Sequence, residues 1–364
     1  MKRRGLLQAG AALGAFGLPW GAAWAQAAGG AVAAPDAASG AAGAALPAVL
    51  SRPALQTPLA LRGALLAATG AGPRLLVAGE RGTVAYSDDA GKTWAQAQVP
   101  ARVSITALHF DNPREGWAAG HFGTLLRSSD GGQTWRLVMD GARAAQVLLR
   151  DAQDEGQRRA AERKVEEGPD KPFFDLAQAG GKLLAVGAFG LALESADGGA
   201  SFQSLAGRLP NPRQFHMYGM AAAGSRVFVV GEQGLLMRSA DAGASFTAVA
   251  TPYKGSFFGV LLPADGVVLV YGLRGNVWRS ADDGATWAQV TNPVTVSISA
   301  GTVLADGAVV LVAQNGDVLL SRDQGQNFTR RPAAPPFPAA GVVAAGDGQL
   351  VLTGLRGWLR VPLG

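Results

Sequence analysis

Six aspartates occupy the third position of a recurring eight-residue motif, Ser-x-Asp-x-Gly-x-(Thr/Ser/Asn)-(Trp/Phe). The six are Asp89, Asp130, Asp197, Asp241, Asp282 and Asp323. Carboxylates can serve as general acids and bases, as glycosidase nucleophiles or as calcium ligands. In this pattern we expect a structural role, because such an Asp accepts backbone N–H groups inside a hairpin turn and the Gly supplies a positive φ. The aromatic residue that closes each motif is expected to pack between neighbouring units.

The elements that carry these motifs are repeats of about 41 residues. Seven four-residue turns, six of them Gly-x-x-Gly, each follow an apolar run; they lie at 79–82, 120–123, 187–190, 231–234, 272–275, 313–316 and 354–357. The first unit contains four short segments with the composition of strands, at 65–68, 75–78, 83–87 and 94–99. Four-stranded units of this length stack radially as blades. The sequence therefore predicts an all-β fold, a seven-bladed β-propeller over residues 48–364.

Two parts of the chain depart from the repeat. The last unit ends after Val361 without an Asp motif or a fourth strand, so we expect residues 48–57 to supply that strand and close the ring. An insertion at 141–171 separates the second and third blades, and its stretch 144–167 is rich in Ala, Arg, Glu and Gln, which predicts helix. Its nearly balanced charge fits a solvated helix on a loop; the alternatives are a docking element or a lid over the axis.

Residues 1–25 have the layout of an export signal. The pair Arg3-Arg4 precedes a weakly apolar stretch, and small residues offer cleavage after Ala25 or Ala27. The order of residues resembles a twin-arginine signal, with an ordinary secretory signal as the alternative. We therefore expect an exported, periplasmic protein whose mature chain has no membrane-spanning segment.

Composition narrows the function classes further. The Ala/Gly-rich residues 26–47 are expected to be a disordered linker. The chain has no cysteine and only three histidines, which argues against thiol chemistry, disulfides and metal centres. The net charge of +5 includes three cations in the signal, so the mature chain is only weakly basic. We expect no cofactor, no metal and no nucleic-acid partner, and a monomeric protein.

The tandem motif is the Asp-box, or bacterial neuraminidase repeat. Together with the 41-residue period, the Gly-x-x-Gly turns and the export signal, it resembles the photosystem II stability and assembly factor family over roughly residues 48–364. That resemblance implies a non-enzymatic, lumenal seven-bladed propeller that binds newly made membrane subunits. It implies a partner in a membrane protein complex, or a subunit of an envelope transporter, and a role in assembly or support.

The alternative is an Asp-box glycoside hydrolase, similar to a sialidase, with an axial active site. Such an enzyme needs an Arg cluster, a Tyr nucleophile with a Glu partner, and convergent carboxylates. Tyr218 and Tyr253 are the tyrosines near loops, and Glu80 and Glu232 share one repeat position three blades apart. We expect these glutamates to be solvated turn residues.

Charge is predicted to divide between the two faces of the ring. Turns between second and third strands share one face with the connections between blades, and nine basic residues fall there: Arg81, Arg102, Arg208, Arg213, Lys254, Arg274, Arg330, Arg331 and Arg356. The Asp-boxes fall on the opposite face. We expect the basic face to bind an acidic partner, the alternative being a solvated rim that binds nothing.

Overall fold

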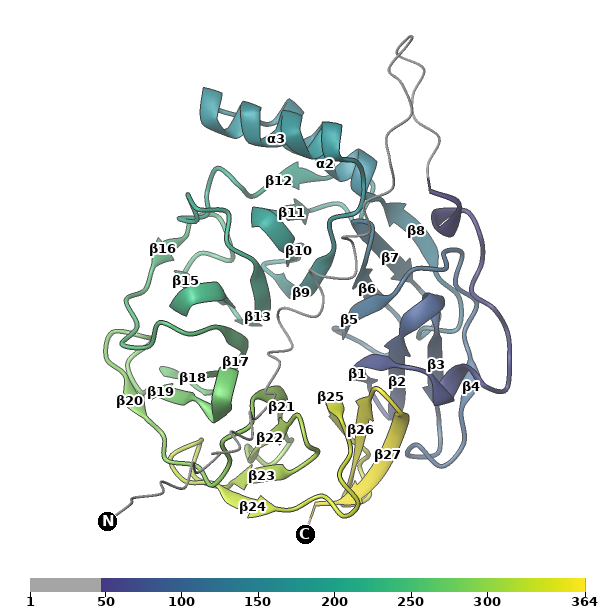
Figure 1. The fold of residues 1–364 in the computed structure, drawn as a ribbon, viewed down its shortest axis with the longest axis vertical. Coiled ribbons are helices and arrows are strands. Elements are labelled where there is room, and N and C mark those ends of the chain that lie inside the picture. The colour runs from purple at the N-terminus through teal and green to yellow at the C-terminus, as the bar shows by residue number, and fades with distance from the viewer. Residues whose placement is uncertain (1–46, 364) are drawn as a thin grey trace, which may run out of the picture. The chain divides into compact units, whose positions relative to one another are not determined.

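The computed structural model describes residues 47–363, which form a ring of seven antiparallel sheets (Figure 1). The predicted signal at 1–25 and nearly all of the predicted linker lie outside the described residues. The ring confirms the predicted seven-bladed β-propeller, and sheets that follow one another in the sequence are neighbours around it (Figure 1).

Six blades have four strands each, and the seventh has three. Blades one to three contain β1 (Leu65–Ala71), β2 (Arg74–Gly79), β3 (Val84–Ser87), β4 (Ala95–Gln96), β5 (Ile105–Phe110), β6 (Gly116–Gly120), β7 (Thr124–Ser128), β8 (Arg136–Met139), β9 (Phe173–Ala179), β10 (Lys182–Gly187), β11 (Ala192–Ser195) and β12 (Gln203–Ser204). Blades four and five contain β13 (Met217–Ala223), β14 (Arg226–Gly231), β15 (Leu236–Ser239), β16 (Thr247–Ala248), β17 (Phe257–Ala264), β18 (Val267–Gly272), β19 (Val277–Ser280) and β20 (Ala288–Gln289). Blades six and seven contain β21 (Ile298–Val303), β22 (Val309–Ala313), β23 (Val318–Ser321), β24 (Thr329–Arg331), β25 (Ala339–Ala344), β26 (Gln349–Gly354) and β27 (Gly357–Pro362).

The core lies between the blades. The second strand of each blade is apolar on both faces because a neighbouring blade covers each face, and in β14 the residues Val227–Val230 have no exposed surface. The aromatic residues that close the Asp-boxes take part in this packing, as predicted. Trp135 is 6% exposed and meets Phe110 edge-on at 5.9 Å between ring centres.

The predicted closing strand at the N-terminus is wrong. Residues 48–57 do not pair with β27; they follow the outer side of blade one, where the Ala54 N–H donates to Val99 O at 2.9 Å and the Arg102 N–H donates to Val49 O at 2.7 Å. The physical reason is burial, since Leu50 and Ala54 enter the apolar cluster between blades one and two.

The ring closes instead by packing of blade seven against blade one. Leu75 and Val77 of blade one share an apolar cluster with Val343 and Val351 of blade seven. Side-chain burial between two sheets thus replaces the backbone pairing that many closed rings use.

The insertion forms two helices, α2 (Gly141–Arg150) and α3 (Glu155–Glu167), which confirms the predicted helical segment and adds a break within it. Each helix starts at an aspartate N-cap: Asp140 accepts from the Arg143 N–H at 3.0 Å, and Asp154 from the Gln157 N–H at 2.8 Å. The pair lies at the periphery of blade three, beside β12 (Figure 1).

Candidate partner-binding face

Strand direction sorts the connections of the propeller onto two faces. Because each blade is antiparallel, the turn between its second and third strands emerges on the same side as the connection to the next blade. We call this side the turn face. The Asp-boxes join third to fourth strands and emerge on the other side, the Asp-box face.

Two of the predicted arginines sit in strained turns. Arg81 lies in the short 3-10 turn η3 (Glu80–Gly82) and Arg274 in η6 (Leu273–Gly275), with φ angles of 58° and 56°. Both side chains are exposed. A non-glycine residue in the left-handed region costs about 1 kcal/mol, so the fold holds these two arginines in place at a cost to its own stability. Phe122, Phe189 and Gln233 have the same left-handed φ in the corresponding turns, so this conformation belongs to the repeated turn.

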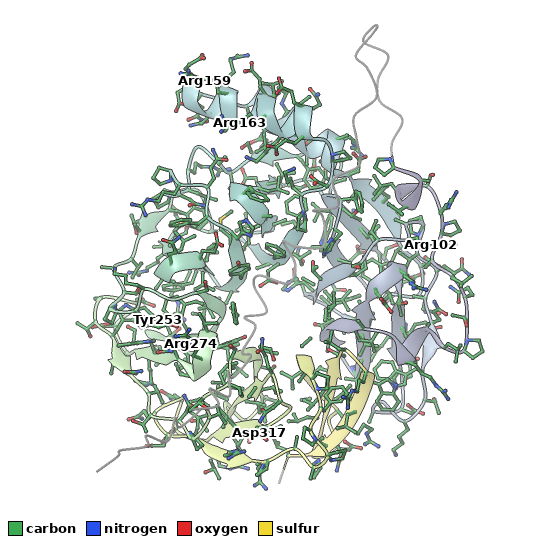
Figure 2. The ribbon with its side chains drawn as sticks, viewed as in Figure 1. Arg102, Arg159, Arg163, Tyr253, Arg274 and Asp317 are labelled. Atoms are coloured by element: carbon green, nitrogen blue, oxygen red, sulfur yellow. The ribbon has the colours of Figure 1, made fainter. Side chains whose placement is uncertain are left out.

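Six of the nine predicted basic residues are exposed and form no salt bridge within residues 47–363. These are Arg81, Arg213, Lys254, Arg274, Arg331 and Arg356. Figure 2 shows Arg274 beside Tyr253 on blade five, and Arg102 on the other side of the ring. The turn face therefore carries unpaired positive charge at several blades.

The other three are engaged within the propeller. Arg330 pairs with Asp317 at 2.8 Å, and Arg102 donates to Pro53 O at 3.1 Å. Arg208 pairs with Glu194 at 2.5 Å and donates to Gly243 O, an atom of the fourth Asp-box, at 3.0 Å. Its guanidinium thus reaches the Asp-box of the next blade, although its backbone belongs to a turn-face connection. Sequence position could not give these partners.

The Asp-boxes have one shared geometry. In the fifth box, Asp282 accepts from the Thr286 N–H at 2.8 Å and from the hydroxyls of Thr286 and Ser280 at 2.6 and 2.7 Å. These bonds lower the pKa of Asp282 to about 2. Ser280 Oγ in turn accepts from the buried Gly284 N–H at 2.8 Å. Each Asp-box carboxylate accepts hydrogen bonds from its own turn. It therefore has the predicted structural role of holding that turn together.

The Asp-box face holds less free negative charge than its aspartates suggest. Several acids there pair with arginines that lie in strands or directly after one: Arg74–Asp88 at 2.7 Å, Arg226–Asp283 at 2.8 Å, Arg322–Asp306 at 3.5 Å and Arg360–Asp347 at 2.5 Å. The six Asp-box carboxylates form no salt bridge within residues 47–363, so the two faces differ in charge through these carboxylates and through the unpaired cations of the turn face.

An aromatic cluster on the turn face was not predicted. Phe174, Tyr218 and Phe258 are the second residues of the inner strands β9, β13 and β17. The ring centres of Phe174 and Tyr218 lie 5.5 Å apart, and those of Tyr218 and Phe258 5.8 Å. Phe189, 47% exposed in the third turn, meets His216 at 4.4 Å. The sequence could have indicated this cluster, because an aromatic residue occupies the second position of the inner strand in three consecutive blades.

Glu232 and Glu80 stay apart and are bound in their own blades. Glu232 accepts from the His216 N–H at 2.8 Å and from the Tyr218 hydroxyl at 3.4 Å. Glu80 accepts from the Ala64 N–H at 3.3 Å. Both glutamates are half-buried and hydrogen-bonded, so the prediction of solvated turn residues is wrong for them. Burial raises the pKa of Tyr218, which disfavours the phenolate that a Tyr nucleophile needs.

The described residues contain neither a metal-binding cluster nor a membrane-spanning helix. Within residues 47–363 no three His, Cys, Asp or Glu side chains gather in a way that could hold a metal ion. No helix in that part of the chain is long and apolar enough to cross a membrane.

Comparison with known proteins gives a match over part of the chain. Residues 170–332 match the family model described as photosynthesis system II assembly factor YCF48. This match covers less than half of the chain, and over that stretch the chain is similar to the photosystem II assembly factors. A search of curated proteins finds no match to this chain.

Solved structures share the propeller fold of this chain. "YCF48 bound to D1 peptide" is 16% identical with a TM-score of 0.61, over 83% of this chain and 94% of that chain. YCF48 from Cyanidioschyzon merolae is 13% identical with a TM-score of 0.60, over 82% and 95%. The GH74 enzyme of Niastella koreensis is 12% identical with a TM-score of 0.55, over 82% of this chain and 52% of that chain. At these identities the likeness shows the fold alone.

Proposed function

We propose that this propeller is a non-enzymatic binding protein that supports the assembly of a membrane protein complex or envelope transporter. The observation that carries the proposal is the turn face, where unpaired arginines occur together with a half-buried aromatic cluster that includes the exposed Phe189. A related structure is titled as bound to a D1 peptide, which supports a protein segment as the ligand. The partner segment is acidic and is steered by the cations of this face.

Charge reversal on the turn face tests this proposal. Arg81, Arg274 and Arg356 are changed together to Glu, and the exported protein is used to capture partners from detergent-solubilised envelopes of its own host. We expect capture of membrane subunits to be lost at low and moderate salt, with an unchanged melting temperature. The matched control changes Lys92, Arg114 and Arg136 to Glu; all three are exposed, Lys92 and Arg114 in turns of the Asp-box face and Arg136 at the start of β8. Equal capture by both triple variants would overturn the proposal.

The location is part of the proposal. We propose that the Arg3-Arg4 pair directs export of the folded chain to the periplasm, because a propeller without cysteines can fold completely in the cytoplasm. Changing both arginines to Lys is expected to leave the precursor in the cytoplasm. Unimpaired export in a strain without the twin-arginine translocase would exclude this route.

One observation favours the glycoside hydrolase alternative. Tyr218 and Glu232 form the Tyr–Glu pair that a sialidase-like site requires, at 3.4 Å. Release of a fluorogenic sialoside by the wild-type protein, abolished in Glu232→Gln, would support that alternative. We expect no release, because Glu232 is bound to the main chain and the pKa of Tyr218 is raised.

A further inference from the structure

Blade seven ends in an open sheet edge. The third strands of the other blades have four or five residues and are each followed by a fourth strand, whereas β27 has six residues and is the last strand of its sheet. No segment of residues 47–363 pairs with its outer edge. An edge of this length with unpaired main-chain groups is a ready template for another strand.

Register shows which groups the edge offers. Residues of β26 and β27 pair from Gln349↔Pro362 to Gly354↔Gly357 without a shift, and the Leu363 N–H donates to Gly348 O at 2.9 Å. In an antiparallel pair the bonded positions alternate, so Leu359 and Val361 bond to β26. The main-chain groups of Trp358 and Arg360 therefore point to the free edge.

A pocket lies next to this edge. It has a volume of about 440 Å³ and is lined by Gln56, Thr57, Pro58, Ala60, Leu61, Trp94 and Gln96. Trp94 contacts Trp358 of β27 at 5.6 Å between ring centres, and Leu61 belongs to the same apolar cluster. Leu55 and Leu59 beside the pocket are 55% and 61% exposed. The surface that borders the edge is thus partly apolar, with Leu61 and Trp94 beside Gln56, Thr57 and Gln96 in the pocket.

Positive charge at the end of the edge where β27 begins indicates an acidic partner. Residues 47–64 contain Arg52 and Arg62 and no acidic residue. Arg62 is exposed, as is Arg356 in the turn that precedes β27, and neither forms a salt bridge within residues 47–363. In the other blades the fourth strand is antiparallel to the third. A strand added to β27 in that direction brings its C-terminal end to these two arginines.

We propose that an extended segment of a partner protein adds to β27 as the fourth strand of blade seven. The segment pairs with the main chain of Trp358 and Arg360, places an apolar side chain in the pocket beside Trp94, and carries an acidic side chain at its C-terminal end for Arg62 and Arg356. This is recognition by strand addition, in which main-chain bonds give affinity and the pocket gives specificity. The inference rests on the proposed function, because it names the surface that receives the partner segment.

Proline at one edge position gives the central test. Arg360→Pro removes a main-chain donor that points to the free edge and leaves the bonds to β26, since proline is tolerated on edge strands. Arg360→Ala is the matched control, because both variants lose the pair with Asp347. The probe is a fluorescent, acetylated and amidated peptide of alternating threonine and valine with one central leucine and a final aspartate.

We expect the proline variant to bind the probe at least tenfold more weakly than the alanine variant, in fluorescence anisotropy with the exported protein. A probe N-methylated at the residues that face β27 is expected not to bind, and one methylated at the alternate residues is expected to bind. A final lysine in place of aspartate is expected to weaken binding several-fold. Equal affinity of the proline and alanine variants, or of the two methylated probes, would overturn strand addition.

Two other occupants are distinguished by the same material. If the edge is used by a second copy of the chain, Arg360→Pro will change a dimer into a monomer in sedimentation, which overturns a partner segment. If residues 26–46 fill the edge, their deletion will raise probe affinity many-fold, which also overturns it. Partner capture that is lost in the Arg81/Arg274/Arg356 variant but kept in Arg360→Pro refutes strand addition alone and leaves the proposed function standing.

Discussion

The indole rings of Trp94 and Trp358 lie 5.6 Å apart and are tilted by 56° to one another. Trp94 closes the first Asp-box and Trp358 lies on the last strand of the chain, so this contact joins the two ends of the propeller. The contact belongs to the apolar cluster that also contains Leu75 and Val351. Closure of the ring depends on this cluster, because no strand from one end of residues 47–363 completes the blade at the other end.

Truncation of Trp358 is expected to weaken this closure. Trp358→Ala removes a large, partly buried ring, and we expect a loss of roughly 2–4 kcal/mol in the free energy of unfolding. The measurement is urea denaturation followed by circular dichroism. In a double-mutant cycle with Trp94→Ala, the two losses are expected to be non-additive, since the rings touch. Additive losses would show that the contact contributes little to closure.

The serine of an Asp-box is expected to matter for stability. Ser280 is 1% exposed, and its hydroxyl joins Asp282 to the buried Gly284 N–H. Ser280→Ala leaves that N–H without its acceptor, which costs roughly 1–3 kcal/mol. Thr286→Ser keeps the hydroxyl that Asp282 accepts from and serves as the control. A Ser280→Ala protein as stable as the control would refute this account of the motif.

Asp282 and Asp175 together are expected to make the free energy of unfolding largest near pH 4–5. The pKa of Asp282 is lowered to about 2, so its contribution is complete above about pH 4 and is lost as the pH falls toward 2. Burial raises the pKa of Asp175 to about 7, so the folded state is favoured below about pH 4 and loses stability as the pH rises to 7.

Substitution of Asp175 separates the loss of stability between pH 4 and 7 from the loss at acid pH. Asp175 accepts from the Met220 N–H at 2.7 Å, and Ala or Gly occupies its register position in the other six blades. Asp175→Ala is expected to abolish the decline between pH 4 and 7, a difference of roughly 1–3 kcal/mol, and to keep the acid limb. Urea midpoints at pH 3, 5 and 8 measure both effects. A variant with the wild-type decline would assign that decline to other groups.

Arg274 is expected to lower the free energy of unfolding, because its backbone has a left-handed conformation, and to contribute to binding. With φ at 56°, Arg274→Gly relieves the left-handed strain, whereas Arg274→Ala keeps it. We expect the glycine variant to be more stable than the alanine variant by about 1 kcal/mol. Both variants are expected to weaken capture of the partner equally. Unequal capture would mean that the turn conformation, and not the guanidinium, is recognised.

Much of the fold could be predicted because it is local. Within each Asp-box the carboxylate and serine bonds join residues at most four positions apart, such as Asp282 with Thr286. The Gly-x-x-Gly turns contain a similarly short bond, such as that from the Thr83 N–H to Glu80 O, so the type and order of residues are enough to predict these turns. Because these motifs recur at a regular spacing, the sequence also predicted the number of blades. The structural aspartates and the helical insertion could be predicted in the same way from local residue types.

What the tertiary structure decided depends on residues far apart in the sequence. The segment with Leu50 and Ala54 could pack between blades one and two or pair with β27. It packs between the blades, where both side chains are buried. The aromatic cluster unites Phe174, Tyr218 and Phe258 from three blades, and the Arg208 guanidinium finds Glu194 and the next Asp-box. These contacts depend on how the blades turn about the axis and on which surfaces are left uncovered. A pattern of residue types does not encode that competition, because the free energy of burial is set only when all the surfaces are present.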